Sequence, residues 1–260
     1  MASIVAIVNQ KGGVGKTTVT LGLASAAQAA GHRTLVVDAD PQASATWALG
    51  VEPETVEYGT SEAIAANKSG AAGKAVVTST WGSEVDLVPA GRDLMSREGE
   101  GGREPVLRLR KALTGVSDGY EFTFIDCSPA LGLTTKGALS AADFVLLVVE
   151  PAALSLRGIA AVSDTIDDVW ESHNPGLDIA GVVVNRVPPV SGEADRQYEA
   201  LAKMLGRRTI WEPAIPQRVV IAQALAERRP IHSLGYRAAD SAETFDKLYA
   251  RLRRTARKAK

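Results

Sequence analysis

The sequence contains a single cysteine, Cys127, among its 260 residues. One thiol cannot form a disulfide within the chain, and it cannot supply a C-x-x-C metal or redox motif. The three histidines, His32, His173 and His232, are scattered without the spacing of metal ligands. The sequence therefore predicts neither a disulfide-stabilised fold nor a histidine or cysteine metal site, and Cys127 is expected to be a small buried apolar residue.

Long apolar runs are also missing. No stretch approaches the roughly 18 consecutive apolar residues of a membrane span. The first apolar run, residues 4–8, is too short for a signal peptide. Aromatic residues make up 5% of the chain and do not gather into a stacking platform for bases. A cytoplasmic protein is expected.

Charge of one sign is lacking as well, since the formal net charge is -1 at pH 7. The last ten residues, 251–260 (RLRRTARKAK), differ from the rest because they carry six basic side chains and no acidic one. Basic character is therefore local, and a DNA-binding function would depend on clustered cations rather than on the overall charge.

What the sequence does have is a repeated alternation of strand-like and helical stretches. With 45% apolar residues, the chain is long enough for one α/β domain over 1–260 with a basic tail at about 251–260. The alternation predicts a mostly parallel sheet with helices on both faces. Segments 66–83 and 96–104 are expected to be surface connections. The expected strands are 4–8, 34–37, 85–88, 122–125, 144–149 and 179–184.

Polar motifs follow four of these strands. A glycine-rich loop follows the first, Asp38 and Asp40 follow the second, and Asp126 and Asn185 follow 122–125 and 179–184. In a parallel sheet these ends meet at one edge, where ligands bind. The sequence therefore predicts one site at this edge.

The loop reads N-Q-K-G-G-V-G-K-T-T over residues 9–18. Glycines after a strand and before a helix let backbone N–H groups converge on a phosphate. Lys16 and Thr17 match the end of the pattern G-x-x-x-x-G-K-[ST], in which the lysine reaches phosphate and the hydroxyl reaches Mg²⁺. Gln10 stands where that pattern has glycine, whereas the variant K-G-G-x-G-K-[ST], with its additional Lys11, fits in full. The expected nucleotide contacts are Lys11, Gly12, Gly13, Val14, Gly15, Lys16, Thr17 and Thr18.

This variant resembles the deviant Walker ATPases of the ParA/MinD family, and most closely the small chromosome-type (Soj-like) ParA branch. The resemblance covers nearly the full chain. It includes VVDADPQASATWALG (36–50), DLVPAGRDL (86–94), FTFIDCSPALGLTTKGAL (122–139), AIPQR (214–218) and RPI (229–231). It implies a P-loop NTPase-like fold, ATP or ADP as ligand, Mg²⁺ as cofactor and ATP hydrolysis.

The resemblance also implies roles for individual residues. It places Asp40 at the attacking water and Lys11 across a homodimer, where this lysine would meet the partner's phosphates. Lys16 would neutralise phosphate charge. Thr17 and Asp126 would hold Mg²⁺, with Asp38 nearby. Turn or helix-cap roles remain the alternative for the three aspartates.

Adenine recognition is assigned to Asn185, whose amide offers both a donor and an acceptor. Its alternative is an ordinary turn asparagine. Loop 213–217, including Ala214, Ile215 and Pro216, is expected on the other side of the base.

The leading hypothesis is a ParA-type ATPase that forms an ATP-sandwich dimer, binds DNA non-specifically at the nucleoid, and positions DNA or protein cargo. A ParB-like protein or another adaptor would stimulate its hydrolysis. Candidate DNA contacts are Arg186, Arg207, Arg208, Arg218 and the tail arginines, with plain solvated arginines as the alternative.

Three other functions are considered. A MinD-like membrane ATPase would need an apolar amphipathic end, yet the last eight residues offer only alanine as an apolar type. An electron carrier related to nitrogenase reductase would need more cysteine ligands than Cys127. A small-molecule ATP-dependent enzyme, such as a biotin-pathway synthetase, is disfavoured by the full-length ParA match but is not forbidden.

Overall fold

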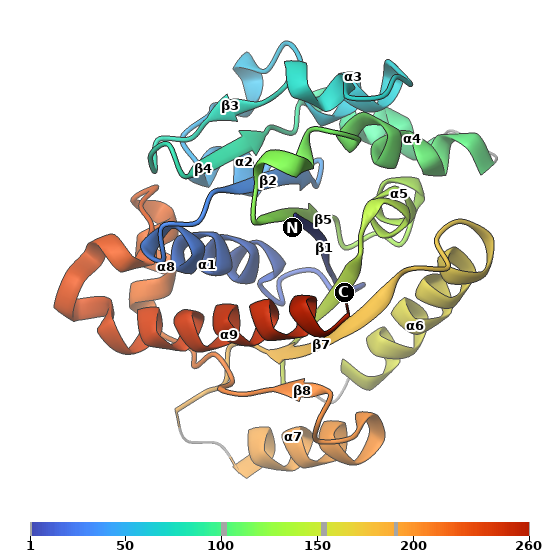
Figure 1. Ribbon diagram of the computed structural model, residues 1–260. Helices are drawn as coiled ribbons and strands as arrows, with labels where there is room; N and C mark the ends of the chain where they lie inside the picture. The colour runs from blue at the N-terminus through green and yellow to red at the C-terminus, as the bar shows by residue number, and fades with distance from the viewer. Residues whose placement is uncertain (1, 100–102, 152–154, 190–191, 260) are drawn as a thin grey trace.

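The computed structural model of the chain describes residues 2–99, 103–151, 155–189 and 192–259. Within these ranges one eight-stranded sheet lies between layers of helices (Figure 1). The strands are β1 (Ser3–Val8), β2 (Thr34–Ala39), β3 (Val77–Thr78), β4 (Val85–Val88), β5 (Phe122–Cys127), β6 (Phe144–Val149), β7 (Asp178–Val184) and β8 (Ile210–Trp211).

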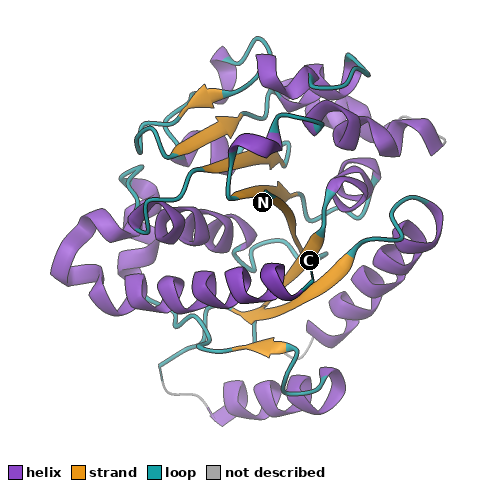
Figure 2. Cartoon of the chain, viewed as in Figure 1, coloured by secondary structure: helices purple, strands orange, loops and turns teal. Residues whose placement is uncertain are grey.

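Helices alternate with these strands along most of the described chain (Figure 2). The α-helices are α1 (Lys16–Ala29), α2 (Ser44–Ala48), α3 (Thr60–Ala65), α4 (Arg103–Leu113), α5 (Leu133–Ala141), α6 (Ser155–Ser172), α7 (Gly192–Leu205), α8 (Val219–Ala226) and α9 (Ala239–Lys258). The 3-10 helices are η1 (Pro53–Thr55), η2 (Ala71–Lys74), η3 (Arg92–Gly99), η4 (Ser117–Gly119) and η5 (Ile231–Ala238).

The strand order is β3-β4-β2-β5-β1-β6-β7-β8, and β1 therefore lies between β5 and β6. Only the β3–β4 pairing is antiparallel among the strands described. The carboxyl ends of the parallel strands consequently meet at one edge, as predicted. In the register of β2 and β5, Asp38 lies directly opposite Asp126.

The two faces of the sheet are covered by different helices. Because side chains alternate along a strand, Val5 and Ile7 join the apolar cluster beneath α1, α8 and α9. Ala6 and Val8 join the opposite cluster, under α4, α5 and α6. Burial on both faces explains why these strands read as continuous apolar runs.

Helix α9, red in Figure 1, packs along α1. A Cβ on Gly22 of α1 would lie 2.1 Å from the Phe245 ring, so glycine permits this close approach. Leu248, Tyr249 and Leu252 continue the buried stripe at helical spacing. The docking of α9 therefore uses the apolar residues that an amphipathic membrane anchor would need.

The basic segment 251–260 continues this helix through Lys258, and Lys260 lies outside the described residues. Leu252 and Ala256 are buried, which explains why these turns stay on the domain. Arg251 donates hydrogen bonds to the carbonyls of Ile210 and Arg208. A helix with basic side chains on its outer face thus stands where the sequence suggested a tail.

All six predicted strands are confirmed, and so is the burial of Cys127. The connections 66–83 and 96–104 carry more regular structure than expected. The first contains η2 and β3, and the second contains the end of η3 and the start of α4, with residues 100–102 outside the described ranges. No helix in the described ranges combines the length and apolar character that crossing a membrane requires.

Candidate nucleotide-binding site

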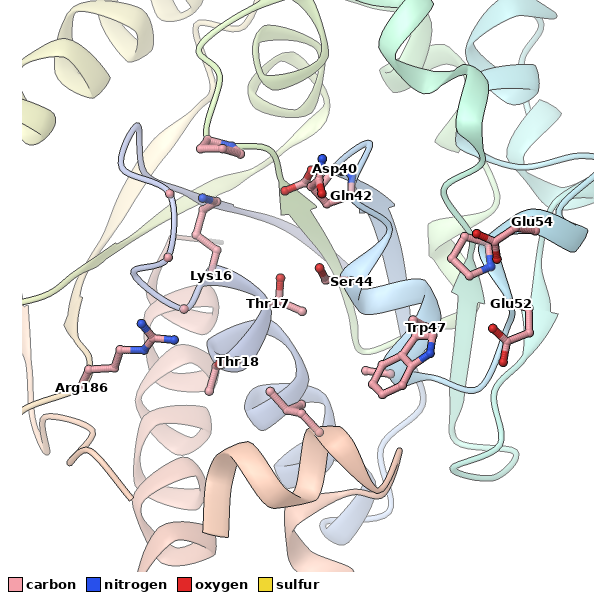
Figure 3. A pocket seen from close by; sticks show the side chains of 17 residues that line it. Lys16, Thr17, Thr18, Asp40, Gln42, Ser44, Trp47, Glu52, Glu54 and Arg186 are labelled. Atoms are coloured by element: carbon pink, nitrogen blue, oxygen red, sulfur yellow. Dashed lines mark hydrogen bonds between the residues drawn. The ribbon is translucent and has the colours of Figure 1, made fainter. Parts of the chain in front are cut away.

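The loop between β1 and α1 borders a cavity of about 780 Å³ at the carboxyl edge of the sheet (Figure 3). Gly15 caps α1 in a left-handed conformation, with φ at 87°. A Cβ there would lie 2.2 Å from the Asn185 side-chain nitrogen, so the position requires glycine for both reasons. The loop amides and the α1 N-terminus can therefore receive an anion. The lining includes Gly12, Gly13, Gly15, Lys16, Thr17 and Thr18.

Lys16 is the first residue of α1 and lines this cavity. Only 6% of the residue is exposed. Burial lowers the pKa of its ammonium group, and the nearby Asp126 carboxylate opposes that shift. A cation held in so little water attracts an anion strongly, because the local dielectric constant is low.

Thr17 lines the cavity and brings its hydroxyl to Asp126, whose carboxylate is fully buried and lies outside the described lining. Thr17 Oγ1 donates to Asp126 Oδ2 at 2.6 Å, and Thr20 Oγ1 donates to Asp126 Oδ1 at 3.2 Å. Burial and the charge of Asp38 raise the Asp126 pKa, whereas Thr17 and Lys16 oppose this shift. Oxygen ligands of this kind suit Mg²⁺, which retains several waters and takes few protein contacts.

Asp38 and Asp40 separate in the structure. Asp40 lines the cavity, and its Oδ1 accepts the N–H of Gln42 at 2.9 Å. Asp38 is fully buried; it accepts bonds from the Thr46 N–H and hydroxyl at 2.8 and 2.7 Å, and from the Asp40 N–H at 3.1 Å. Burial raises the Asp38 pKa and the Thr46 bonds oppose it. Asp38 thus holds the turn that presents Asp40.

Asn185 is buried, and its side-chain nitrogen donates to the Val14 carbonyl at 2.7 Å. It lines a second cavity, of about 500 Å³, with Pro216, Gln217, Arg218 and Val219. Thr18, Arg186 and Leu225 line both cavities, which therefore adjoin. A base could occupy the second cavity while its phosphates occupy the first.

The loop expected beside the base is only partly in this position. Ile215 is fully buried, and its N–H donates to the Val184 carbonyl at 2.8 Å, so it belongs to the core at the end of β7. Pro216 lines the second cavity, whereas the lining as described does not include Ala214. Residues 216–219, which also cap α8, form more of the wall than residues 214 and 215.

The Lys11 side chain contacts Glu150, whereas Lys16 lines the cavity. Lys11 Nζ lies 3.0 Å from Glu150 Oε2, and Arg186 Nη1 lies 3.2 Å from Glu150 Oε1. Gly12 and Gly13 line the phosphate cavity, but the described lining does not include Lys11. In the single chain this lysine is therefore paired beside the cavity rather than inside it.

The candidate DNA contacts fall into two groups. Arg186 and Arg218 border the nucleotide cavities. Arg207 and Arg208 lie between α7 and β8, where Arg207 pairs with Glu199 at 2.5 Å and the Arg208 carbonyl accepts from Arg251. The structure does not bring the four arginines together in one chain.

The motifs of the sequence did not indicate one residue beside the cavity and one at its rim. Glu150, which contacts Lys11 and Arg186, gave no motif signal, although its place after an apolar strand matched that of Asp126. Trp47 lies at the rim opposite Arg186 (Figure 3), and the Arg228 guanidinium stacks over its ring at 4.2 Å. Glu52 pairs with Arg228 at 2.7 Å. A lone tryptophan after D-P-Q could have been flagged only by its position near Asp40.

The described residues contain no cluster of three or more histidine, cysteine, aspartate or glutamate side chains that could hold a metal by themselves. Phosphate oxygens and water would therefore complete the coordination at Thr17 and Asp126. Sheet, glycine loop and paired Thr17–Asp126 together define the class as a P-loop NTPase fold.

Comparison with known proteins extends this class to a family. A family model described as an AAA domain matches residues 2–179. The sporulation initiation inhibitor protein Soj of Bacillus subtilis is 33% identical over 235 residues, which cover 89% of this chain and 90% of Soj. The chain belongs to the ParA family of P-loop ATPases, as the resemblance implied.

An uncharacterized protein of Mycobacterium tuberculosis is 38% identical over 192 residues, which cover 72% of this chain. The match spans 59% of that longer protein. The activities and partners of such relatives are therefore not transferred to this chain by similarity alone.

Two solved structures are similar throughout. One is cobyrinic acid a,c-diamide synthase from Mycobacterium smegmatis with bound ADP and magnesium, at 28% identity and a TM-score of 0.74, covering 88% of this chain and 91% of that chain. The other is apo McdA from Cyanothece, at 21% identity and a TM-score of 0.83, covering 98% and 100%. The second shows the shared fold, and the predicted α/β P-loop architecture is confirmed.

Proposed function

We propose that this chain is a Mg²⁺-dependent ATPase of the ParA type that binds ATP and ADP. The observation that carries the proposal is the 2.6 Å hydrogen bond from Thr17 to Asp126, made by a threonine that lines a glycine-walled cavity together with Lys16. The magnesium and ADP of the M. smegmatis structure support the same ligands here. Mg²⁺ would supply charge neutralisation on the phosphates.

The residues of the chain divide the remaining tasks. Lys16 and the loop amides bind phosphate, Thr17 and Asp126 hold the metal, and Asp40 orients the attacking water from its position on the cavity. Asp38 acts indirectly, through its hydrogen bond to the Asp40 N–H. Phosphoryl transfer to water needs such positioning and charge stabilisation rather than a covalent intermediate.

The proposed active form is a homodimer with ATP between the subunits. Arg186 and Arg218 line the cavities, and the partly exposed Lys11 side chain lies beside them, where a second copy could meet these cations. In that dimer Lys11 would contact the partner's phosphates, as an arginine finger does in trans. Loss of the γ-phosphate on hydrolysis would release both subunits, which gives a nucleotide-dependent switch.

The proposed target of the ATP dimer is DNA of any sequence, which places the protein in the cytoplasm at the nucleoid. A ParB-like protein or another adaptor would stimulate hydrolysis and link the switch to a DNA or protein cargo. The outer face of α9 is a candidate DNA-binding surface, because Arg254 and Arg257 are exposed on it while the buried Leu252 and Ala256 hold the helix on the domain. A dimer would present two copies of each cation, so weak contacts with DNA phosphates from both subunits would together raise the affinity for DNA.

DNA binding across a salt series, in ATP and in ADP, tests this proposal. We expect duplex binding in ATP with little sequence preference and a steep fall with salt, because phosphate contacts release counterions. Replacing Arg254 and Arg257 by alanine should weaken binding and flatten the salt slope, with Leu252 and Ala256 left intact. Arg218→Ala should act in the same direction. Arg110→Ala, an exposed arginine of α4 on the opposite face, is the control.

The same samples should be sedimented with anionic lipid vesicles, because the MinD-like alternative predicts lipid binding in ATP. Vesicle binding without DNA binding would favour that alternative. Binding to neither would favour a small-molecule or protein-only ATPase.

A further inference from the structure

Glu150 occupies the position directly after β6, beside the strand that leads into the phosphate loop. Its side chain is 19% exposed. One carboxylate oxygen lies 3.0 Å from Lys11 Nζ, and the other lies 3.2 Å from Arg186 Nη1. A single anion therefore joins the glycine loop to the segment that follows β7.

The Arg186 side chain of this contact starts from a constrained backbone. Arg186 has φ at 56°, in the left-handed region that few residues other than glycine adopt. Its neighbours are tied down on both sides, since the Asn185 side chain bonds to Val14 and the Val187 N–H donates to the Ile215 carbonyl at 3.0 Å. A strained conformation held in this way is typical of functional sites.

The Lys11 end of the contact is carried by a long, partly exposed side chain. The Lys11 backbone N–H donates to Asn9 Oδ1 at 2.9 Å, and its side chain is 41% exposed. The long side chain can therefore swing while the loop stays in place. Its ammonium group is retained beside its own subunit by Glu150 and lies outside the described lining of the phosphate cavity.

We infer that Glu150 is a positioning residue that retains Lys11 within its own subunit and thereby opposes ATP-dependent dimerisation. The inference rests on the proposed function, because Lys11 must leave Glu150 before it can contact phosphate in the second subunit. Dimerisation then exchanges one anionic partner of Lys11 for another. The attraction between Lys11 and the phosphates of the second subunit is therefore reduced by the energy of the Lys11–Glu150 pair that must first be broken.

The size of the effect follows from exposure and symmetry. A partly exposed ion pair changes an equilibrium by up to about fivefold, because water and salt screen the charges. A two-fold symmetric dimer breaks two copies of the Lys11–Glu150 pair. We therefore expect Glu150→Gln to lower the dimer dissociation constant in ATP by several-fold, up to roughly 25-fold. The affinity of a single chain for ATP should change far less.

The experiment is sedimentation equilibrium of the full chain with Mg²⁺ and ATP, on wild type, Glu150→Gln, Lys11→Ala and the double variant. Glu243→Gln is the matched control, because Glu243 pairs with Lys247 at 2.8 Å on α9, away from the cavities. If Glu150 acts through Lys11, Glu150→Gln tightens the dimer only where Lys11 is present. An unchanged or weaker dimer, or equal tightening without Lys11, overturns the inference.

A second measurement separates this inference from the proposed function. The nucleotide-free chain is treated with an amine-reactive reagent, and mass spectrometry follows the rate at which Lys11 is labelled. Lys11 should be labelled several-fold faster in Glu150→Gln than in wild type, with the labelling rate of Lys247 as an internal reference. If wild type stays monomeric in ATP, the proposed dimer is wrong, and the labelling rate then tests the Lys11–Glu150 pair by itself. Equal labelling rates of Lys11 in wild type and in Glu150→Gln would overturn the pairing.

Discussion

The two ends of the glycine loop carry the same kind of residue in opposite surroundings. Lys16 begins α1, is 6% exposed and lines the phosphate cavity. Lys11 precedes the glycines, has a side chain that is 41% exposed, and contacts Glu150. Five positions of sequence therefore separate a buried cation that lines the cavity from a partly exposed cation that is paired beside it. Burial, rather than charge, distinguishes the two lysines, and we propose that it separates a phosphate-binding end of the loop from a switching end.

The largest expected effect lies at the buried end. Lys16→Ala should lower ATP affinity by at least about 30-fold, because removing one partner from a desolvated charge pair costs about 2–5 kcal/mol. Titration of the variant with a fluorescent ATP analogue measures the loss. Lys247→Ala removes an exposed lysine of α9 and is the control. An ATP affinity close to that of wild type in Lys16→Ala would contradict the assignment of Lys16 as the phosphate-binding lysine of the loop.

The next expected effect separates binding from hydrolysis. Asp40→Ala should reduce ATP turnover by about 100-fold, since positioning and activating the attacking group contributes factors of this size. ATP binding and the ATP-dependent dimer should survive, because Asp40 is not the residue that holds phosphate charge. Phosphate release and sedimentation report the two properties. Normal turnover in this variant would move the water-positioning role to another residue.

A smaller effect concerns stability and pH in the nucleotide-free and metal-free chain. Burial raises the pKa values of Asp38 and Asp126, so the folded chain binds more protons than the unfolded chain between about pH 4 and pH 7. Stability from these groups should therefore be greatest at low pH and fall as pH rises through that window, by about 1.4 kcal/mol for each unit by which a pKa is raised.

Urea unfolding at pH 5 and pH 8 measures this slope in wild type and Asp126→Asn. The variant should flatten the slope and gain stability at pH 8, because it removes a buried negative charge while keeping the shape of the side chain. A slope as steep as that of wild type would mean that other groups cause the pH dependence.

Most of the fold could be read from the sequence because its strands are buried on both faces. Residues 144–149 match β6 residue for residue, and 85–88 match β4. Strands β3 and β8 were missed because two residues are too few to show a period. Their pairing depends on neighbours far away in the chain.

The site could be read only where a local pattern encodes it. The loop and Asp126 follow from spacing, since strand, turn and helix fix their positions. The contact of Lys11 with Glu150 and Arg186 depends on the order β1-β6-β7, which brings three distant segments to one edge. Likewise, the burial of Leu252 and Ala256 that turns the expected tail into part of α9 is a property of tertiary packing.

The switching role of Lys11 is tested most directly by the oligomeric state of the chain in each nucleotide. Sedimentation of wild type and Lys11→Ala, in ATP and in ADP, measures it at one protein concentration. We expect a wild-type dimer in ATP, a monomer in ADP, and a Lys11→Ala monomer that still binds ATP within about threefold of wild type. A Lys11→Ala protein that dimerises normally in ATP would contradict this role.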